Sequence, residues 1–315
     1  MDFLVLGGTS FVGRAVVEYA LGHGHRLTLF SRGRTGAGLF PAAERRTGDR
    51  DTGDYAALAG SSWDAVVDVS AYVPRHVQQA TDAVSSRAGR YLLISTVSVY
   101  DHVPAPPAGL AEDAPRRPPE RGTEDVTGET YGPLKVACED DAAARWGDRA
   151  TVVRPGIVGG PHDPTDRFTY WVRRAARGGR VAVPGRLDQP VQVVDSRDLA
   201  ALVVALLEAD RSGTFNAVGP AEPVTLGGLV QACAQAAGSA VELVPVTVEP
   251  GFPLVLPEGR DDAMFLRRAD AARAAGLTAT PLTTTAADVL AWDRSRGEPP
   301  LSVGMSAERE SALLG

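Results

Sequence analysis

Several features that mark other classes of protein are scarce in this sequence of 315 residues. It has only two cysteines, Cys138 and Cys233, without metal-ligand spacing, so we interpret both as small buried side chains in a reducing compartment. The longest apolar run, residues 199–207, is far shorter than the roughly 20 residues of a membrane span. The net charge of −7 argues against a surface for nucleic acids or anionic membranes.

The composition that remains is that of an ordinary folded chain. Hydrophobic residues make up 44% and charged residues 23%, which excludes a largely disordered protein. The first residues lack the basic segment of a secretory signal, so we expect a cytoplasmic location. The length suits two domains, or one large domain with an appended lobe. Lysine is almost absent, because the 32 basic residues include a single lysine, Lys135.

The first 160 residues alternate short apolar runs with helical patterns. The runs are rich in valine, isoleucine and leucine and lack polar alternation, as in strands buried on both faces of a parallel sheet. We expect strands at residues 3–6, 26–30, 65–69, 91–94 and 151–154. Helices are expected at residues 12–21, 75–86 and 131–145. The repeated strand–helix–strand order predicts an α/β fold with a doubly wound parallel sheet.

The pattern loosens after residue 160. We expect helices at residues 168–177, 196–208, 225–237 and 284–294, and strands at 191–194 and 214–218. These elements predict a dinucleotide-binding domain of residues 1–158 plus about 191–219. Residues 159–190 and 220–315 would then form a smaller mixed substrate-binding lobe. The proline-rich stretch 103–130 predicts an exposed loop, which we interpret as a lid because chemistry-bearing residues flank it.

A glycine-rich turn, Gly-Gly-Thr-Ser-Phe-Val-Gly at residues 7–13, separates the first strand from the first helix. Small residues there let a diphosphate approach the backbone N–H groups of the helix start. The second strand ends in Ser31-Arg32-Gly33-Arg34, with no carboxylate to bind a ribose 2′-hydroxyl as an NAD site would have. Because the arginine fork suits a phosphate, we predict NADP(H) as the preferred cofactor, with NAD(H) as the second choice.

The single lysine follows Tyr131 by four residues, so both side chains face the same side of the predicted helix. A neighbouring ammonium lowers the pKa of a phenol from its reference value of about 10, and lysine has three donors to offer a ribose hydroxyl. Ser95 and Thr96 follow the strand 91–94, at the edge of the sheet where ligands bind. We assign Thr96 a hydrogen bond to the substrate oxygen, with Ser95 as its substitute.

At this point the sequence resembles the extended short-chain dehydrogenase/reductase family, in its NAD-dependent epimerase/dehydratase branch, which implies a Rossmann fold. The resemblance rests on these features: the turn 7–13, Asp49, the strand end 95–100, Tyr131 with Lys135, Arg154-Pro155-Gly156, residues 193–198 and Phe215-Asn216. It implies that Asp49 and Arg50 flank the adenine. It also implies that Ser70 and Ala71 line the cofactor, although many relatives carry an asparagine-rich turn there.

Spacing and resemblance together define two sets of expected contacts. The cofactor set comprises Gly7, Thr9, Ser10, Phe11, Val12, Gly13, Ser31, Arg32, Arg34, Asp49, Arg50, Ser70, Ala71, Ser95, Tyr131, Lys135, Pro155, Gly156 and Ile157, the last three by resemblance at the nicotinamide end. The substrate set comprises Ser98, Tyr100, His162, Arg167, Arg173 and Gln192. No metal site is expected, because His162 and Asp163 lack a second pair of ligands.

These residues favour an NADP(H)-dependent carbonyl reductase acting on a small molecule. Tyr131 would protonate the carbonyl oxygen, Thr96 would polarise it, and Lys135 would tune the phenol. A nucleotide-sugar epimerase with tightly bound NAD is the first alternative, and a non-catalytic NADP(H)-sensing or RNA-binding relative is the second. The family often forms a four-helix dimer interface, so a homodimer is a further expectation.

Overall fold

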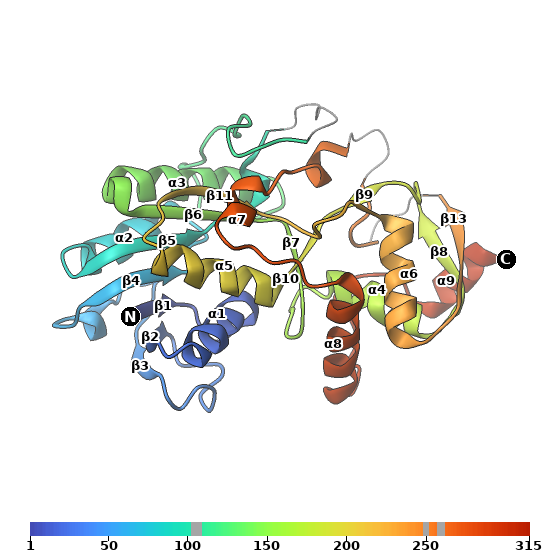
Figure 1. Cartoon of the computed structure of the whole chain (residues 1–315), viewed down its shortest axis with the longest axis horizontal. Helices are drawn as coiled ribbons and strands as arrows, with labels where there is room; N and C mark the ends of the chain where they lie inside the picture. The colour runs from blue at the N-terminus through green and yellow to red at the C-terminus, as the bar shows by residue number, and fades with distance from the viewer. Residues whose placement is uncertain (102–108, 248–251, 257–261) are drawn as a thin grey trace.

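A computed structural model describes residues 1–101, 109–247, 252–256 and 262–315 (Figure 1). Its centre is a sheet of seven strands in the order β11-β6-β5-β4-β1-β2-β3, with every neighbouring pair parallel. The strands are β1 (Asp2–Leu6), β2 (Arg26–Ser31), β3 (Glu44–Thr47), β4 (Trp63–Asp68), β5 (Ala88–Ile94), β6 (Ala150–Pro155) and β11 (Gly213–Ala217). The predicted doubly wound parallel sheet is confirmed.

Helices cover both faces of this sheet (Figure 1). Helices α1 (Phe11–Gly22) and α5 (Ser196–Glu208) share a core cluster with Phe3 and Val5, whereas Leu4 and Leu6 point into the cluster of α2 (Pro74–Val84) and α3 (Tyr131–Trp146). Alternate residues of β1 thus enter two different cores. This arrangement explains why the strand has no polar alternation in its sequence.

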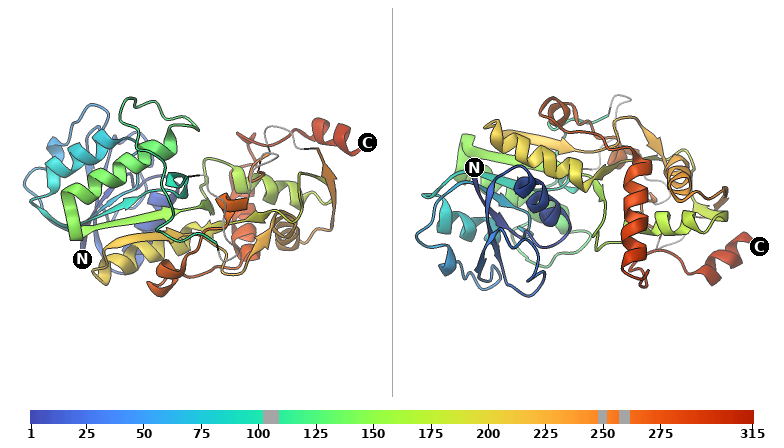
Figure 2. Two further views of the ribbon diagram at one scale, coloured as in Figure 1. Left: turned by 90° about the horizontal axis from the view of Figure 1, so that it is seen from above. Right: turned by 60° about the horizontal axis from the view of Figure 1, so that its bottom comes forward.

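A smaller lobe follows the sheet, as predicted, and Figure 2 shows it beside the sheet domain in two further views. Its core is built from α4 (Arg167–Ala176), α6 (Leu226–Ala237) and α8 (Leu282–Ser295). The parallel pair β8 (Gly179–Pro184) and β13 (Val241–Val246) packs beside them, and α9 (Ala307–Leu314) lies on β8. Two small pairs complete the lobe's border, namely β7 (Ile157–Gly159) with β10 (Val193–Asp195) and β9 (Pro190–Val191) with β12 (Val224–Thr225).

The structure differs from the sequence-based expectation in two places. The single strand expected at residues 191–194 is two strands, β9 and β10, which break at Gln192 and pair with different partners. The chain also returns to the sheet domain late, because α7 (Asp270–Ala274) and its neighbours Ala269 and Leu277 pack into the same core cluster as β1. A helix this short carries too few turns for its apolar period to be recognised.

Residues 109–130 form an extended segment against the outer side of α3. Two bridges, Tyr100 with Arg116 and Leu110 with Arg267, attach its first half to other parts of the chain. Ion pairs then fasten it along α3, as between Arg121 and Asp141 at 2.8 Å. Residues 103–108 of the expected lid lie outside the described residues, so the lid interpretation stays a prediction. The homodimer likewise stays a prediction.

Four short 3-10 turns, η1 (Ala56–Leu58), η2 (Val97–Val99), η3 (Gly147–Arg149) and η4 (Asp262–Phe265), complete the described elements. Within the described ranges, none of the helices is long and apolar enough to cross a membrane. The same ranges hold no group of three or more histidine, cysteine, aspartate or glutamate side chains arranged to bind a metal ion.

Candidate active site

A cleft with a volume of about 880 Å³ opens at the carboxyl ends of the strands. Residues that follow β1, β2, β4, β5 and β6 form one wall. The opposite wall comes from the smaller lobe and its border, through Pro164, Thr165, Arg167, Gln192, Met264 and Phe265. In doubly wound folds this edge of the sheet is where ligands bind.

The glycine-rich turn forms the start of the cleft. Gly7 has a φ of +96°, which favours glycine, and a Cβ at Gly13 would lie only 2.0 Å from the carbonyl oxygen of Gly7. Glycine at position 13 therefore lets helix α1 lie closer to the end of β1 than a residue with a side chain at that position would allow. Ser10 caps α1 with an extended backbone and no side-chain hydrogen bond to the helix, so the N–H groups of the first turn stay open. This cradle fits a dinucleotide diphosphate.

The end of β2 borders the same cleft. Ser31, Arg32 and Arg34 line it, and both arginines are exposed. The Nη1 atom of Arg32 lies 3.4 Å from Oδ2 of Asp51, a long contact between two exposed groups. Surface ion pairs of this kind contribute little to stability, so the guanidinium groups of Arg32 and Arg34 are both accessible to an anionic ligand.

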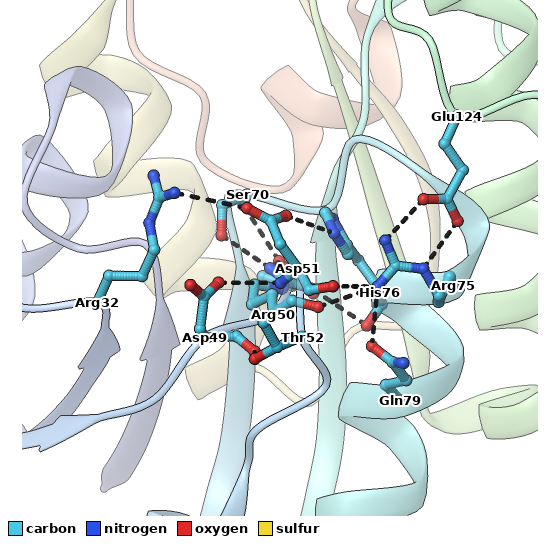
Figure 3. A network of polar contacts seen from close by, with 11 residues as sticks. Arg32, Asp49, Arg50, Asp51, Thr52, Ser70, Arg75, His76, Gln79 and Glu124 are labelled. Atoms are coloured by element: carbon cyan, nitrogen blue, oxygen red, sulfur yellow. Dashed lines mark hydrogen bonds and ion pairs between the residues drawn. The ribbon is translucent and has the colours of Figure 1, made fainter.

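Arg50 lines the cleft but uses its donors inside the protein (Figure 3). Its two terminal nitrogens lie 2.6 and 2.7 Å from the carboxylate oxygens of Asp68, and Nη1 donates to the Ser70 hydroxyl at 2.7 Å. Burial acts to raise the pKa of Asp68, but the contacts with Arg50 outweigh it, and the pKa lies below its usual value. Arg50 therefore braces the floor of this end of the cleft, where the resemblance implied the adenine, and its neighbour Asp49 lines the cleft beside it.

Sequence reasoning missed two residues of this end, His76 and Arg75, both on α2 (Figure 3). Arg75 donates to the carbonyl oxygens of Arg50 and Asp51 at 3.1 Å each and pairs with Glu124 at 2.6 Å. Burial, followed by the charge of Arg50, lowers the pKa of His76, whose Nε2 lies 3.3 Å from Oδ1 of Asp51. No motif marks these contacts, because they join a loop to a helix about 25 residues later.

The three predicted catalytic residues meet at the other end of the cleft, which all of them line. The Thr96 hydroxyl lies close enough to the Tyr131 phenol to act on its pKa, and it donates a hydrogen bond to the Ser98 hydroxyl at 3.1 Å. Lys135 is only 3% exposed, and its Nζ donates to the carbonyl oxygens of Ala71 at 2.6 Å and Ile94 at 2.8 Å. Since an ammonium has three donors, one remains for a further acceptor such as a ribose hydroxyl.

The electrostatics of Tyr131 differ from the sequence-based expectation. Burial raises the pKa of the phenol above its usual value, while the neighbouring Thr96 hydroxyl and the charge of Arg167 act to lower it. Lys135 was expected to supply this lowering. Its ammonium is held by two carbonyl oxygens instead, and the described structure gives it a positioning role at the ends of β4 and β5.

A buried ion pair that sequence reasoning missed lies directly behind these residues. Glu139, 3% exposed, binds Arg154 through two contacts of 2.9 and 2.6 Å and accepts a hydrogen bond from the Ser95 hydroxyl at 2.5 Å. Arg154 also donates to the Tyr100 hydroxyl at 2.8 Å, which in turn donates to Asn216 at 2.6 Å. Ser95 is therefore no substitute for Thr96, and Tyr100 lies outside the substrate wall.

Of the remaining substrate candidates, Ser98, Arg167 and Gln192 line the cleft, whereas His162 and Arg173 do not. The His162 ring stands edge-on to Trp292, with 5.4 Å between ring centroids. The guanidinium of Arg173 is bound to the carboxylate of Asp293 through two hydrogen bonds of 2.7 Å each.

Gln192 reaches the cleft, yet its amide binds the backbone N–H of Arg267 at 3.0 Å and the carbonyl of Arg267 at 2.8 Å. It positions the wall that carries Met264 and Phe265. Among the cofactor candidates, only Gly13 and Ala71 do not line the cleft, since Gly13 packs on Gly7 and Ala71 offers its carbonyl to Lys135.

Known structures share this fold. A candidate epimerase from Burkholderia cenocepacia J2315 superposes with a TM-score of 0.74 and 22% identity, over 93% of this chain and 98% of its own. A UDP-glucuronic acid 4-epimerase from Bacillus cereus in complex with NAD superposes with a TM-score of 0.72 and 15% identity, and the match covers 94% of this chain and 99% of that one. A dTDP-glucose 4,6-dehydratase from Bacillus anthracis str. Ames in complex with NAD superposes with a TM-score of 0.71 and 16% identity, and the match covers 95% of this chain and 98% of that one.

A relative by sequence is the chloroplast stem-loop binding protein of 41 kDa b from Arabidopsis thaliana, with 24% identity over 260 residues. The match covers 75% of this chain but 63% of the relative, so the chain spans less than two thirds of that protein's length. Residues 3–218 match the NAD dependent epimerase/dehydratase family. This match extends from the glycine-rich turn to the last strand of the sheet and includes the Thr96, Tyr131 and Lys135 site. The chain belongs to the NAD-dependent epimerase/dehydratase family of extended short-chain dehydrogenase/reductase proteins.

Proposed function

We propose that this protein is an NADP(H)-dependent oxidoreductase that reduces a carbonyl group of a small-molecule substrate. The observation that carries the proposal is the meeting of Thr96, Tyr131 and Lys135 at one end of a cleft whose other end has a diphosphate cradle. A bound nicotinamide cofactor supplies a hydride to the carbonyl carbon. The carbonyl oxygen gains a proton, so that the products are an alcohol and the oxidised cofactor.

The side chains divide the remaining work. Tyr131 delivers the proton, and Thr96, which lines the cleft with it, holds the carbonyl oxygen. The pKa of Tyr131 is raised, chiefly by burial, so the phenol is protonated at neutral pH. A protonated phenol suits the reductive direction, in which it acts as an acid. Lys135 fixes the ends of β4 and β5 and offers its third donor to the cofactor ribose.

Preference for NADP(H) is the finer part of the proposal. It is supported by the two exposed arginines, Arg32 and Arg34, which line the cleft just after β2 together with the Ser31 hydroxyl. A guanidinium binds phosphate oxygens bidentately and would favour the 2′-phosphate of NADP(H). The solved relatives from Bacillus contain NAD, so the choice between cofactors is open to a direct measurement.

Two other functions remain in view. Epimerisation is favoured by the names of several structural relatives, and it would require a tightly held cofactor that is oxidised and reduced again in each cycle. RNA binding is favoured by the name of the Arabidopsis relative, whereas a net charge of −7 opposes it. Purified protein that carries bound NAD and needs no added cofactor would point to epimerisation.

The test is a panel of ketones and nucleotide sugars followed by NADPH absorbance, with Tyr131→Phe as the variant. Loss of a positioned proton donor should lower turnover about 10²- to 10⁴-fold, while NADPH binding changes less than about twofold. Tyr19→Phe is the matched control, since Tyr19 of α1 stacks on His23, which follows the helix, and does not line the cleft. Undiminished turnover by Tyr131→Phe would contradict the proposed role.

A further inference from the structure

Among the described cleft-lining residues, Arg167 is the arginine at the end that holds Tyr131, whereas Arg32, Arg34 and Arg50 follow β2 and β3 at the other end. Arg32 faces Asp51 and Arg50 is bound to Asp68, both at the adenine end. The Nε of Arg167 donates to the Thr165 hydroxyl at 3.1 Å. Within the described residues, no carboxylate oxygen lies within 4.0 Å of its guanidinium, and its two terminal nitrogens have no hydrogen-bond partner.

The protein holds this guanidinium from behind. The hydroxyl of Thr165 donates to Oδ1 of Asp163 at 2.7 Å, and its backbone N–H donates to the same oxygen at 2.8 Å. Asp163 is only 1% exposed, so this support is fixed in the lobe. Helix α4, which begins at Arg167, is anchored by Trp171, whose Nε1 donates to the carbonyl of Pro253 at 2.8 Å. The protein thus holds the Nε side of the Arg167 guanidinium in place, and the two terminal nitrogens remain able to donate to a ligand.

The free fork belongs to the reacting end of the cleft. Arg167 lies close enough to Tyr131 for its charge to act on the phenol. The nearby wall offers the Ser98 hydroxyl and the apolar side chains of Met264 and Phe265. The only carboxylates among the described cleft-lining residues are Asp49 and Asp51, at the adenine end, and the carboxyl of Asp163, whose charge interacts with Arg167, is buried behind Thr165.

Building on the proposed function, we propose that Arg167 binds an anionic group of the substrate, a carboxylate or a phosphate, beside the carbonyl that is reduced. A planar fork with two free donors matches the paired oxygens of either group. The charge also sorts substrates, because a neutral analogue leaves a partly buried cation without a partner. The preferred substrates are therefore oxo acids or oxo phosphates of small size.

The experiment compares two pairs of probes, phenylglyoxylate with its methyl ester and dihydroxyacetone phosphate with dihydroxyacetone. Binding to the NADP-loaded protein is measured by calorimetry, and turnover by NADPH absorbance. The variants are Arg167→Gln, which removes the charge, and Arg167→Lys, which keeps the charge but loses the fork. Arg294→Gln is the matched control, since its side chain is 60% exposed and lies outside the cleft.

We expect the wild type to prefer at least one anionic probe to its neutral partner by tenfold or more. Arg167→Gln should weaken that probe about 10- to 150-fold, the range for hydrogen bonds to charged groups, and change the neutral partner less than twofold. Arg167→Lys should fall between the two, and Arg294→Gln should match the wild type. Unchanged melting temperatures will show that the variants are folded.

The outcomes separate this inference from the proposed function. Failure of the wild type to bind either anion, or an equal loss of anionic and neutral probes in Arg167→Gln, overturns the role of Arg167. Binding of an anion that depends on Arg167, without any oxidation of NADPH, supports the anion site and overturns the reductase proposal alone. Preference for phenylglyoxylate identifies a carboxylate, and preference for dihydroxyacetone phosphate identifies a phosphate.

Discussion

Glu139→Gln tests the buried ion pair behind the catalytic residues. The change keeps the shape of the side chain and its contact with Ser95, but it leaves Arg154, whose side chain is 5% exposed, without its counter-charge. Breaking a buried pair in this way costs about 3–5 kcal/mol. Because Arg154 retains the Tyr100 hydroxyl at 2.8 Å, we expect the lower value, about 3 kcal/mol. With an unfolding entropy of roughly 2.1 cal/mol/K per residue, the melting temperature should fall by about 4–5 °C.

Thermal unfolding followed by circular dichroism measures this shift. Glu298→Gln is the matched control, since its carboxylate is 48% exposed and lies 3.9 Å from Arg294, and its melting temperature should change by less than about 1 °C. The double variant Glu139→Gln with Arg154→Met should lose less stability than the two single variants together, because the groups interact directly. Equal melting temperatures for the Glu139 and Glu298 variants, or strict additivity in the cycle, would refute the reasoning.

Three further predictions follow from the cleft. Arg32→Ala should raise the Kd of NADPH about tenfold or more and leave that of NADH within twofold in a fluorescence titration; equal losses would argue against a 2′-phosphate contact. Lys135→Arg should lower both turnover and stability to urea despite the retained charge, and wild-type behaviour would show that the compact ammonium is dispensable. The pKa of Asp68 is lower in the folded protein than in the unfolded chain, where it is about 4. The pairing of Asp68 with Arg50 therefore stabilises the fold at any pH above the unfolded pKa, and this stabilisation is lost as the pH falls through the lower pKa of the folded protein. In Asp68→Asn the free energy of unfolding should therefore fall less steeply as the pH is lowered below about 4, and an unchanged pH dependence would contradict this assignment.

The parts of the fold and site that the sequence predicts are those that short segments determine. A buried strand, a turn of small residues and a helix follow one another between residues 2 and 22, and local spacing is sufficient to recognise them. The pairing of Tyr131 with Lys135 is equally local, because it rests on one turn of α3. Thr96 follows from the rule that strands of a parallel sheet end at one edge.

The parts that the sequence does not predict are contacts between distant segments. Arg173 looks like an open cation on α4, but Asp293, 120 residues later, binds it. Tyr100 reads as a cleft residue, yet Arg154 and Asn216 hold its hydroxyl inside the protein. In each case the decisive partner lies on another element, and no spacing in the sequence links the two.

The geometry around Lys135 gives a physical reason for the one lysine in an arginine-rich chain. Its Nζ lies 2.6 Å from the carbonyl oxygen of Ala71, in the loop after β4, and 2.8 Å from that of Ile94, the last residue of β5, so both acceptors converge on a single nitrogen. An ammonium is a compact point charge that can donate in three directions, whereas a guanidinium spreads its donors over a plane. At 3% exposure the site has little room for that plane. Elsewhere arginine serves as well or better, since Arg50 and Arg154 each bind a carboxylate through two nitrogens. Arg50 and Arg154 thus face carboxylates, whereas the single lysine faces two carbonyls that converge on one nitrogen beside the reacting end of the cleft.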